Sequence, residues 1–242
     1  MKYQNTQTLM TCIMAASLAL GGAAGAASVL IQNPSFEDPV VSDNNSVLAP
    51  KPSGTFNSWS YTMTTGSQFQ DFGIENPAGT AYTGAGADGT PAGALGSNVI
   101  FLNQGIPGGT INIFQDVGAL APNTLYTLVV SIGQRLDRVN GAPVIGLING
   151  VAGETDAWIN GTILNSTTGV SAVAGSFQDF TVTFTTGATV SSELYIGAQY
   201  TGDPTIQASL DNFRLDASPI PEPAAACLAL LGGVGLLRRR RN

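Results

Sequence analysis

Residues 125–133 read LYTLVVSIG, and residues 177–186 read FQDFTVTFTT. In the first stretch every second residue from Tyr126 to Ile132 is large and apolar. In the second, aromatic or aliphatic residues alternate with threonines. Successive side chains of a strand point to opposite faces, so this alternation predicts two strands that each bury one face.

The same kind of pattern extends over most of the chain. Runs rich in β-formers are separated by Gly, Pro, Asn and Asp turn signals, and no helical period lies between them. The further strands are predicted at 28–32, 58–62, 98–102, 110–117, 144–149, 157–164, 193–200 and 208–215. Residues 64–96, dominated by Gly, Ala and Thr, are expected to form a long surface loop with or without short strands. The prediction is an all-β domain, an antiparallel two-sheet jelly-roll sandwich over residues 28–218.

The N-terminal 27 residues have the pattern of a secretory signal peptide. Lys2 precedes an apolar run from Leu9 to about Ala24, and small residues follow up to Ser28. Cleavage by signal peptidase after Ala26 or Ala27 fits this pattern. A short anchor helix is the alternative, but the run is too short and too rich in small residues for a membrane span.

Residues 219–242 form a tail of three unlike elements. A Pro-Glu-Pro hinge comes first, then 14 apolar or Gly residues, then an arginine run; the named residues are Pro221, Glu222, Pro223, Arg238, Arg239, Arg240 and Arg241. The apolar stretch is shorter than the roughly 20 residues that usually span a bilayer, which favours a transient membrane association. The order of elements resembles the PEP-CTERM sorting signal. That resemblance implies processing by exosortase and delivery to the outer surface or matrix of a Gram-negative-type bacterium that makes exopolysaccharide. A plain tail anchor would not explain Pro-Glu-Pro.

The body between the two ends is acidic and lacks two reactive residue types. Residues 28–218 hold 15 of the 16 acidic residues and four of the nine basic ones, a net charge of −11. Such a charge disfavours nucleic acid as a partner. The body has no Cys, and the chain has no His. Disulfides in the body, His-based catalysis and His-ligated metals are thereby excluded.

Two short motifs mark the edges of the body. Residues 33–37 read NPSFE, and residues 210–213 read LDNF. Together with Gln115 to Arg135 in the middle, they resemble bacterial galactose-binding-like jelly rolls and carbohydrate-binding modules. The resemblance implies a structural calcium held by Glu37 and Asp211, whose oxygens are ligands that calcium takes. The alternative is that both carboxylates cap turns by accepting backbone N–H bonds.

Aromatic residues could bind a sugar if they are exposed. Trp59 and Tyr61 are two apart and so share one strand face, and Trp158 lies among polar residues. Stacking on a pyranose needs an exposed ring face, whereas the alternative is that these rings pack in the core. On the binding interpretation, either Trp59 or Trp158 lies exposed in a groove.

A catalytic role is not expected from these residues. Glu154 and Asp156 form the one close acidic pair in a plausible loop, but no nucleophile motif or phosphate loop accompanies them. The favoured hypothesis is a non-catalytic surface or matrix protein that binds exopolysaccharide. A secreted glycan-active enzyme and a purely structural envelope protein are the alternatives.

Overall fold

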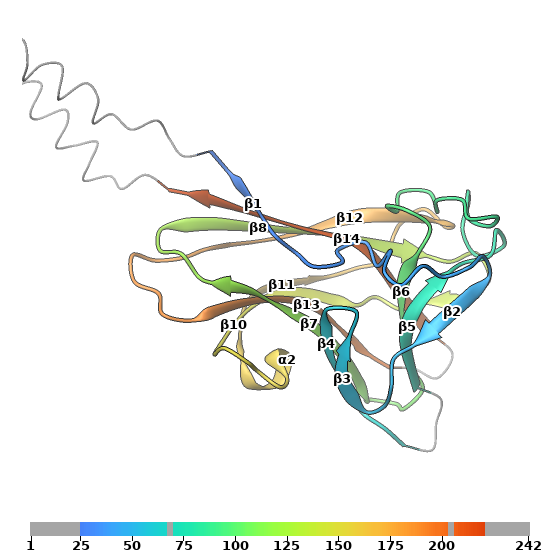
Figure 1. The fold of residues 1–242 in the computed structure, drawn as a ribbon, viewed down its shortest axis with the longest axis horizontal. Coiled ribbons are helices and arrows are strands. Elements are labelled where there is room, and N and C mark those ends of the chain that lie inside the picture. The colour runs from blue at the N-terminus through green and yellow to red at the C-terminus, as the bar shows by residue number, and fades with distance from the viewer. Residues whose placement is uncertain (1–24, 67–69, 203–205, 221–242) are drawn as a thin grey trace, which may run out of the picture.

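The computed structural model describes residues 25–66, 70–202 and 206–220. Two sheets, antiparallel except for one short pairing, pack face to face, which confirms the predicted all-β sandwich (Figure 1). The expected signal and tail helices lie outside the described residues, as do Pro221, Glu222, Pro223, Arg238, Arg239, Arg240 and Arg241. Among the described residues, no helix is long and apolar enough to cross a bilayer.

The eight-stranded sheet has the order β12-β8-β14-β6-β5-β2, and β1 and β9 pair with β14 beside this path. The β9–β14 pairing is parallel and the others are antiparallel. Its strands are β1 (Ala27–Val29), β2 (Asn45–Leu48), β5 (Gln70–Asn76), β6 (Val99–Gln104), β8 (Thr124–Gln134), β9 (Val139–Asn140), β12 (Ser176–Thr185) and β14 (Ile206–Pro219).

The six-stranded sheet has the order β11-β10-β13-β7-β4-β3 and is antiparallel throughout. Its strands are β3 (Ser53–Phe56), β4 (Trp59–Met63), β7 (Thr110–Ala119), β10 (Val144–Gly150), β11 (Thr162–Thr168) and β13 (Glu193–Thr201). A single turn of helix, α2 (Ala157–Asn160), packs below this sheet (Figure 1).

The core lies between the inner faces of the two sheets. In β8, Leu128, Val130 and Ile132 are fully buried, as their alternation predicts. In β4, buried and half-buried residues alternate, and Trp59 and Tyr61 point inward. In β4 and β8 the period-two pattern therefore identifies the face that enters the core.

The outer face of the eight-stranded sheet is covered in part by residues 77–98, named here the roof segment. Tyr82 of this segment is buried and its ring lies 4.9 Å from that of Phe177 on β12. Backbone hydrogen bonds tie the segment down, among them Phe177 N–H to the Ala92 carbonyl at 2.7 Å and Leu136 N–H to the Ala81 carbonyl at 2.9 Å. The long loop expected from the sequence is thus a packed layer over one end of the sheet (Figure 1).

Two segments differ in detail from the sequence-based expectation. The predicted strand at 157–164 begins as α2, because Asp156 caps the free N–H groups of Trp158 and Ile159, and becomes β11 only at Thr162. The segment 64–96 contains β5, which pairs with β6 along six residues. In β5, Phe72 and Ile74 are both in the core and Gly73 lies between them on the opposite face, where a Cβ would lie 2.4 Å from the Val47 carbonyl oxygen on β2.

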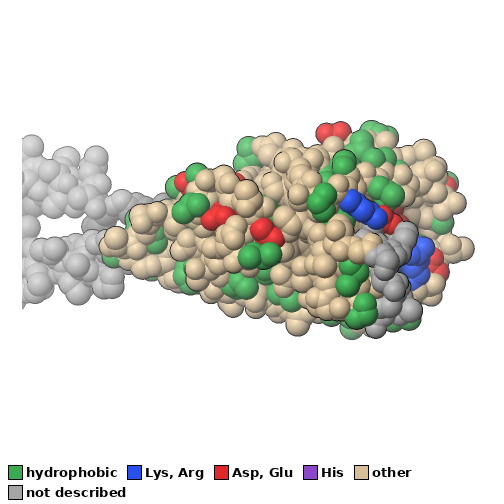
Figure 2. All heavy atoms as spheres, turned by 90° about the horizontal axis from the view of Figure 1, so that it is seen from below, with side chains coloured by type: hydrophobic (Ala, Val, Ile, Leu, Met, Phe, Trp, Pro, Cys, Tyr) green, Lys and Arg blue, Asp and Glu red, His purple; other side chains and the backbone are tan. Residues whose placement is uncertain are grey.

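The lower surface of the sandwich carries few charged side chains. Seen from below, it consists mostly of uncharged polar side chains and backbone, with scattered hydrophobic groups (Figure 2). Nothing on this face gathers into a broad apolar patch.

Candidate functional site

The aromatic residues proposed for sugar stacking are buried. Trp59 is 0% exposed and packs against Phe36 and Phe213, with ring centroids 5.4 and 4.7 Å away. Its indole N–H donates to the Asn33 carbonyl at 3.2 Å. The Tyr61 hydroxyl donates to the Pro50 carbonyl, and its ring packs on Phe72. Both rings belong to the core, so neither offers a free face to a pyranose.

Trp158 is also enclosed, on the opposite side of the six-stranded sheet. It is 7% exposed and belongs to a small cluster with Phe114, Ile148, Ala157 and Tyr195. Its indole N–H donates to the Ile113 carbonyl at 3.1 Å. The expected exposure of Trp59 or Trp158 in a groove is therefore not found, because α2 and the sheet enclose Trp158 and the sandwich core encloses Trp59.

The acidic pair Glu154 and Asp156 does not form a catalytic dyad across a cleft. One oxygen of Asp156 caps α2, and the other accepts hydrogen bonds from the Asn112 amide at 2.8 Å and from the Thr62 hydroxyl. Glu154 instead accepts from the Val151 N–H. Asp156 is therefore a structural acceptor that joins α2 to the six-stranded sheet.

Glu37 and Asp211 lie close together beneath the end of the roof segment. Asp211 is fully buried and one of its oxygens accepts the Leu95 N–H at 2.6 Å. Glu37 accepts the Asn98 N–H at 3.0 Å. Burial raises the pKa of the Asp211 carboxyl well above its usual value, and the nearby charge of Glu37 raises it further. Burial also raises the pKa of Glu37, against the effect of its backbone hydrogen bonds.

These residues fit the predicted calcium. The second Asp211 oxygen and the Asn98 side-chain oxygen are buried without a hydrogen-bond partner among the described residues. With Glu37 they present oxygen ligands from three separate segments, the chemistry that calcium prefers. No cluster of three or more Asp, Glu, Cys or His side chains occurs in the described part of the chain, so amide or backbone oxygens would have to complete the shell. A bound calcium would supply positive charge that offsets the two buried carboxylates and would tie β14 to the roof segment.

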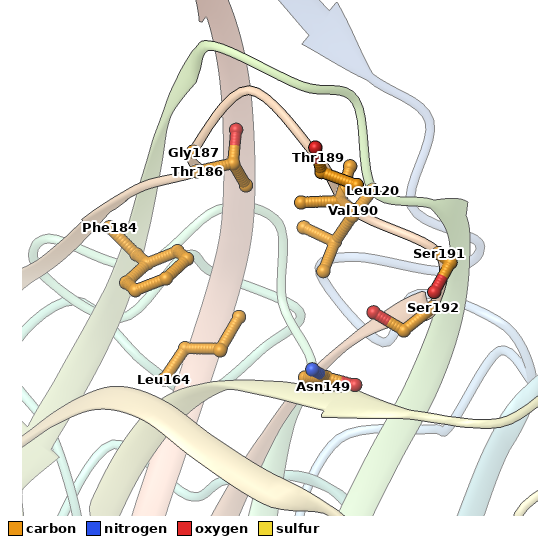
Figure 3. Close-up of a pocket in the computed structure, with 10 residues that line it drawn as sticks. All are labelled: Leu120, Asn149, Leu164, Phe184, Thr186, Gly187, Thr189, Val190, Ser191 and Ser192. Atoms are coloured by element: carbon orange, nitrogen blue, oxygen red, sulfur yellow. The ribbon is translucent and has the colours of Figure 1, made fainter.

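A recess lined by both hydrophobic and uncharged polar residues opens at one end of the sandwich, and it is named here the end recess. It has a volume of about 420 Å³ and lies where the edge strands β11 and β12 meet the loop between β12 and β13. Leu164 and Phe184 lie on one side, and Leu120 and Val190 lie on the other (Figure 3). The remaining lining residues are uncharged: Asn149, Thr186, Gly187, Thr189, Ser191 and Ser192.

A second recess, named here the polar recess, lies at the edge of the eight-stranded sheet, with a volume of about 370 Å³. Its base is Arg135, which is 8% exposed. The Arg135 guanidinium donates to Glu75 at 2.6 Å and to both oxygens of Asp137 at 2.8 and 2.9 Å. It also lies over the Tyr82 ring, 5.8 Å from the centroid. Hydrogen bonding to Arg135 lowers the pKa of Asp137.

Sequence reasoning did not identify either recess. The end recess is formed by four segments that meet only in the fold, and no motif marks it. The polar recess did leave a signal, because Arg135 and Arg138 are two of only four basic residues in the body and lie within one four-residue stretch.

Comparison with solved structures gives the same fold. The Stig cyclase Fisc from Fischerella sp. TAU, in complex with (3Z)-3-(1-methyl-2-pyrrolidinylidene)-3H-indole, is 22% identical, with a TM-score of 0.61 over 81% of this chain and 100% of that one. A cyclase from the same source, in complex with 4-(1H-indol-3-yl)butan-2-one, is 22% identical, with a TM-score of 0.60 over 81% and 100%. The carbohydrate-binding module TmCBM61, in complex with β-1,4-galactotriose, is 12% identical, with a TM-score of 0.44 over 78% and 98%. No curated protein sequence matches the chain.

The match to a protein family is more specific. The family model of the HpiC1 cyclase matches residues 27–216, which is nearly the whole described domain. This finding contradicts the expectation that the protein is not an enzyme. That expectation depended on the absence of histidine and of a clear carboxylate pair. The chain belongs to the HpiC1-like cyclase family.

Proposed function

We propose that this protein is an enzyme that closes a ring within a small, mostly apolar organic molecule held in the end recess. The observation that carries the proposal is the recess itself. Its volume of about 420 Å³ lies within the roughly 300–1,000 Å³ typical of small-molecule sites. Its lining combines four large hydrophobic side chains with uncharged polar ones, which suits a substrate that has an apolar body and a few polar groups.

The recess would favour ring closure by holding the substrate in a folded conformation. Opposing walls formed by Leu164 and Val190 would bring two ends of a flexible molecule together, which removes much of the entropic cost of the reaction. The Asn149 amide and the Ser191 and Ser192 hydroxyls can orient polar groups by hydrogen bonds. None of the ten lining residues is a titratable acid or base, so the contribution proposed for this chain is positioning.

The proposed substrate class is an indole with an unsaturated side chain. Support comes from the family and from the indole compounds named in the complexes of the Fischerella cyclases. A fused bicyclic ring would fill the space between Phe184 and Leu120, and the side chain would fold back over it.

The test uses the full-length chain and two matched variants. Leu164 lines the recess, whereas its neighbour Ile163 is 48% exposed and does not. We expect Leu164→Trp to fill the recess and to weaken binding of 4-(1H-indol-3-yl)butan-2-one by about tenfold or more, equivalent to about 1.4 kcal/mol. Ile163→Trp should bind as the wild type does.

Turnover is measured with alkenyl-indole probes by chromatography and mass spectrometry. Ring closure within one molecule leaves the mass unchanged, so a product of the same mass and a new retention time is expected. The proposal is wrong if no such isomer forms with any probe, or if Leu164→Trp forms it as fast as Ile163→Trp does.

We also propose that the protein is exported, as its two ends predict. Signal peptidase and exosortase would process it, and it would reside in the cell envelope or matrix. Mass spectrometry of the N- and C-termini of the protein recovered from the native host tests this, and intact ends at both sites would contradict it.

A further inference from the structure

We propose that the polar recess is a second binding site, independent of the proposed cyclase site, and that it takes a neutral polyhydroxylated ligand such as a single sugar unit. The recess is lined mainly by side chains with hydrogen-bonding groups: Asn44, Asn45, Ser46, Glu75, Asn76, Thr80, Arg135, Asp137 and Arg138. Pro77 and Ala78 are its apolar lining residues. Unlike the end recess, the polar recess is lined by charged side chains.

The charges of the polar recess are balanced within the protein. Arg135 pairs with Glu75 and Asp137, and Arg138 donates to Gln207 at 3.1 Å. Gln207 in turn donates to the same Glu75 oxygen that Arg135 contacts, at 3.1 Å. The two carboxylates and two guanidinium groups that line the recess balance one another, and Asp88, bonded to Asn76, adds a negative charge beside it. A neutral ligand is therefore favoured over an anion.

The recess also has an unused buried acceptor. Asn76 is 1% exposed, and its amide nitrogen donates to the Val41 carbonyl at 2.9 Å and to Asp88 at 3.0 Å. The side-chain oxygen of Asn76 is buried and has no hydrogen-bond partner among the described residues. An unpaired buried oxygen costs about 1–3 kcal/mol, and a small side-chain shift that opens this oxygen to the recess would let a ligand hydroxyl relieve that cost.

The polar recess also has available hydrogen-bond donors at its opening. Arg138 bonds Gln207 through one nitrogen, which leaves other N–H donors of its guanidinium available. The Thr80 side chain is exposed beside it. Each sugar hydroxyl both donates and accepts, so a polyol can satisfy the Asn76 oxygen and the Arg138 donors together, while its C–H surface contacts the half-buried Ala78.

The site is held in place before any ligand binds. The Asn140 side chain accepts the Arg135 N–H at 2.7 Å and donates to the carbonyls of Arg135 and Arg138 at 3.1 and 3.0 Å. This fixes the turn that carries both arginines. A preformed turn lowers the ordering cost of binding.

The test is saturation-transfer NMR on the full-length protein with named probes. Methyl β-D-galactopyranoside and methyl α-D-glucopyranoside are the neutral sugars. Galactan is included to test whether a polymer is bound as well. Galacturonate, L-serine and indole are the charged, zwitterionic and apolar comparisons. We expect at least one neutral sugar to bind with a Kd on the order of 1 mM, and the other three classes to bind more weakly.

Variants test whether the saturation-transfer signal of the sugar comes from the polar recess. Arg138→Ala and Thr80→Val change exposed residues, so folding is retained, and Arg138→Ala should weaken sugar binding about tenfold. Arg214→Ala removes an exposed arginine elsewhere on the same sheet and should leave binding unchanged. The proposal is overturned if no neutral sugar binds, if galacturonate or serine binds more tightly, or if Arg138→Ala behaves as Arg214→Ala does. Loss of the end recess by Leu164→Trp should not alter the sugar signal.

Discussion

Replacing Arg135 by methionine should destabilise the fold through the charges it leaves behind. Arg135 is the shared partner of Glu75 and Asp137, and its side chain is 7% exposed against 16% and 36% for theirs. Removing one member of a fully buried ion pair costs about 3–5 kcal/mol. Because water reaches both carboxylates in part, we expect about 2–4 kcal/mol, which includes the lost contact with the Tyr82 ring.

Urea unfolding followed by tryptophan fluorescence measures this cost, since Trp59 and Trp158 are both buried in the folded state. Arg214→Met is the matched control. Its ion pair with Asp179 is exposed on both sides, at 44% and 52%, and should contribute no more than about 1 kcal/mol. If Arg135→Met and Arg214→Met shift the urea midpoint equally, the network does not stabilise the fold as argued.

The pH dependence of the same pair gives an independent check. The pKa of Asp137 is lowered in the folded state, so its contribution is present above its unfolded pKa near 3.8 and is lost as the pH falls through the lower folded value. The difference in stability between the wild type and Arg135→Met should therefore shrink below about pH 4. A difference that stays constant from neutral pH to pH 2 would contradict the assignment.

Three further outcomes follow from the structure. Calcium at about 100 times its Kd should stabilise the protein by about 2.7 kcal/mol in thermal unfolding, and Asp211→Asn should abolish the effect. Without calcium, the raised pKa of Asp211 means that stability should increase as the pH falls from 7, which acid titration of the wild type against Asp211→Asn will show or refute. Trp59→Ala should cost about 3–5 kcal/mol in urea unfolding, and a cost below 1 kcal/mol would mean that the ring is not a core residue.

The sandwich could be predicted because its signal is local. Alternation in 125–133 and 177–186 needs only neighbouring residues to be read, and both stretches became paired strands of one sheet. The helical turn of α2 was missed because a single capping residue, Asp156, decides it against the β-forming residues around it. The local pattern of apolar residues therefore predicts the strands, but it does not predict a short helical turn such as α2.

The recesses could not be predicted because they depend on pairings far apart in the chain. The end recess joins Leu120 to Leu164 and Val190, and the polar recess joins Glu75 to Arg135 and Gln207. Glu37 and Asp211 were paired because their motifs resemble those of known jelly rolls. Such a resemblance implies which strands lie side by side, whereas composition does not. Trp59, Tyr61 and Trp158 show the limit of residue type alone. An aromatic residue in the sequence does not reveal whether its ring packs in a core or lines a sugar-binding cleft.

Strand β14 has a consequence for the order in which this molecule can fold. It is the last described strand, and it pairs with β8, β6, β1 and β9. The pairing of Ala27 with Ala217 joins opposite ends of the described domain. Such long-range contacts slow folding. A ribosome must therefore have made residues 206–219 before the larger sheet can close.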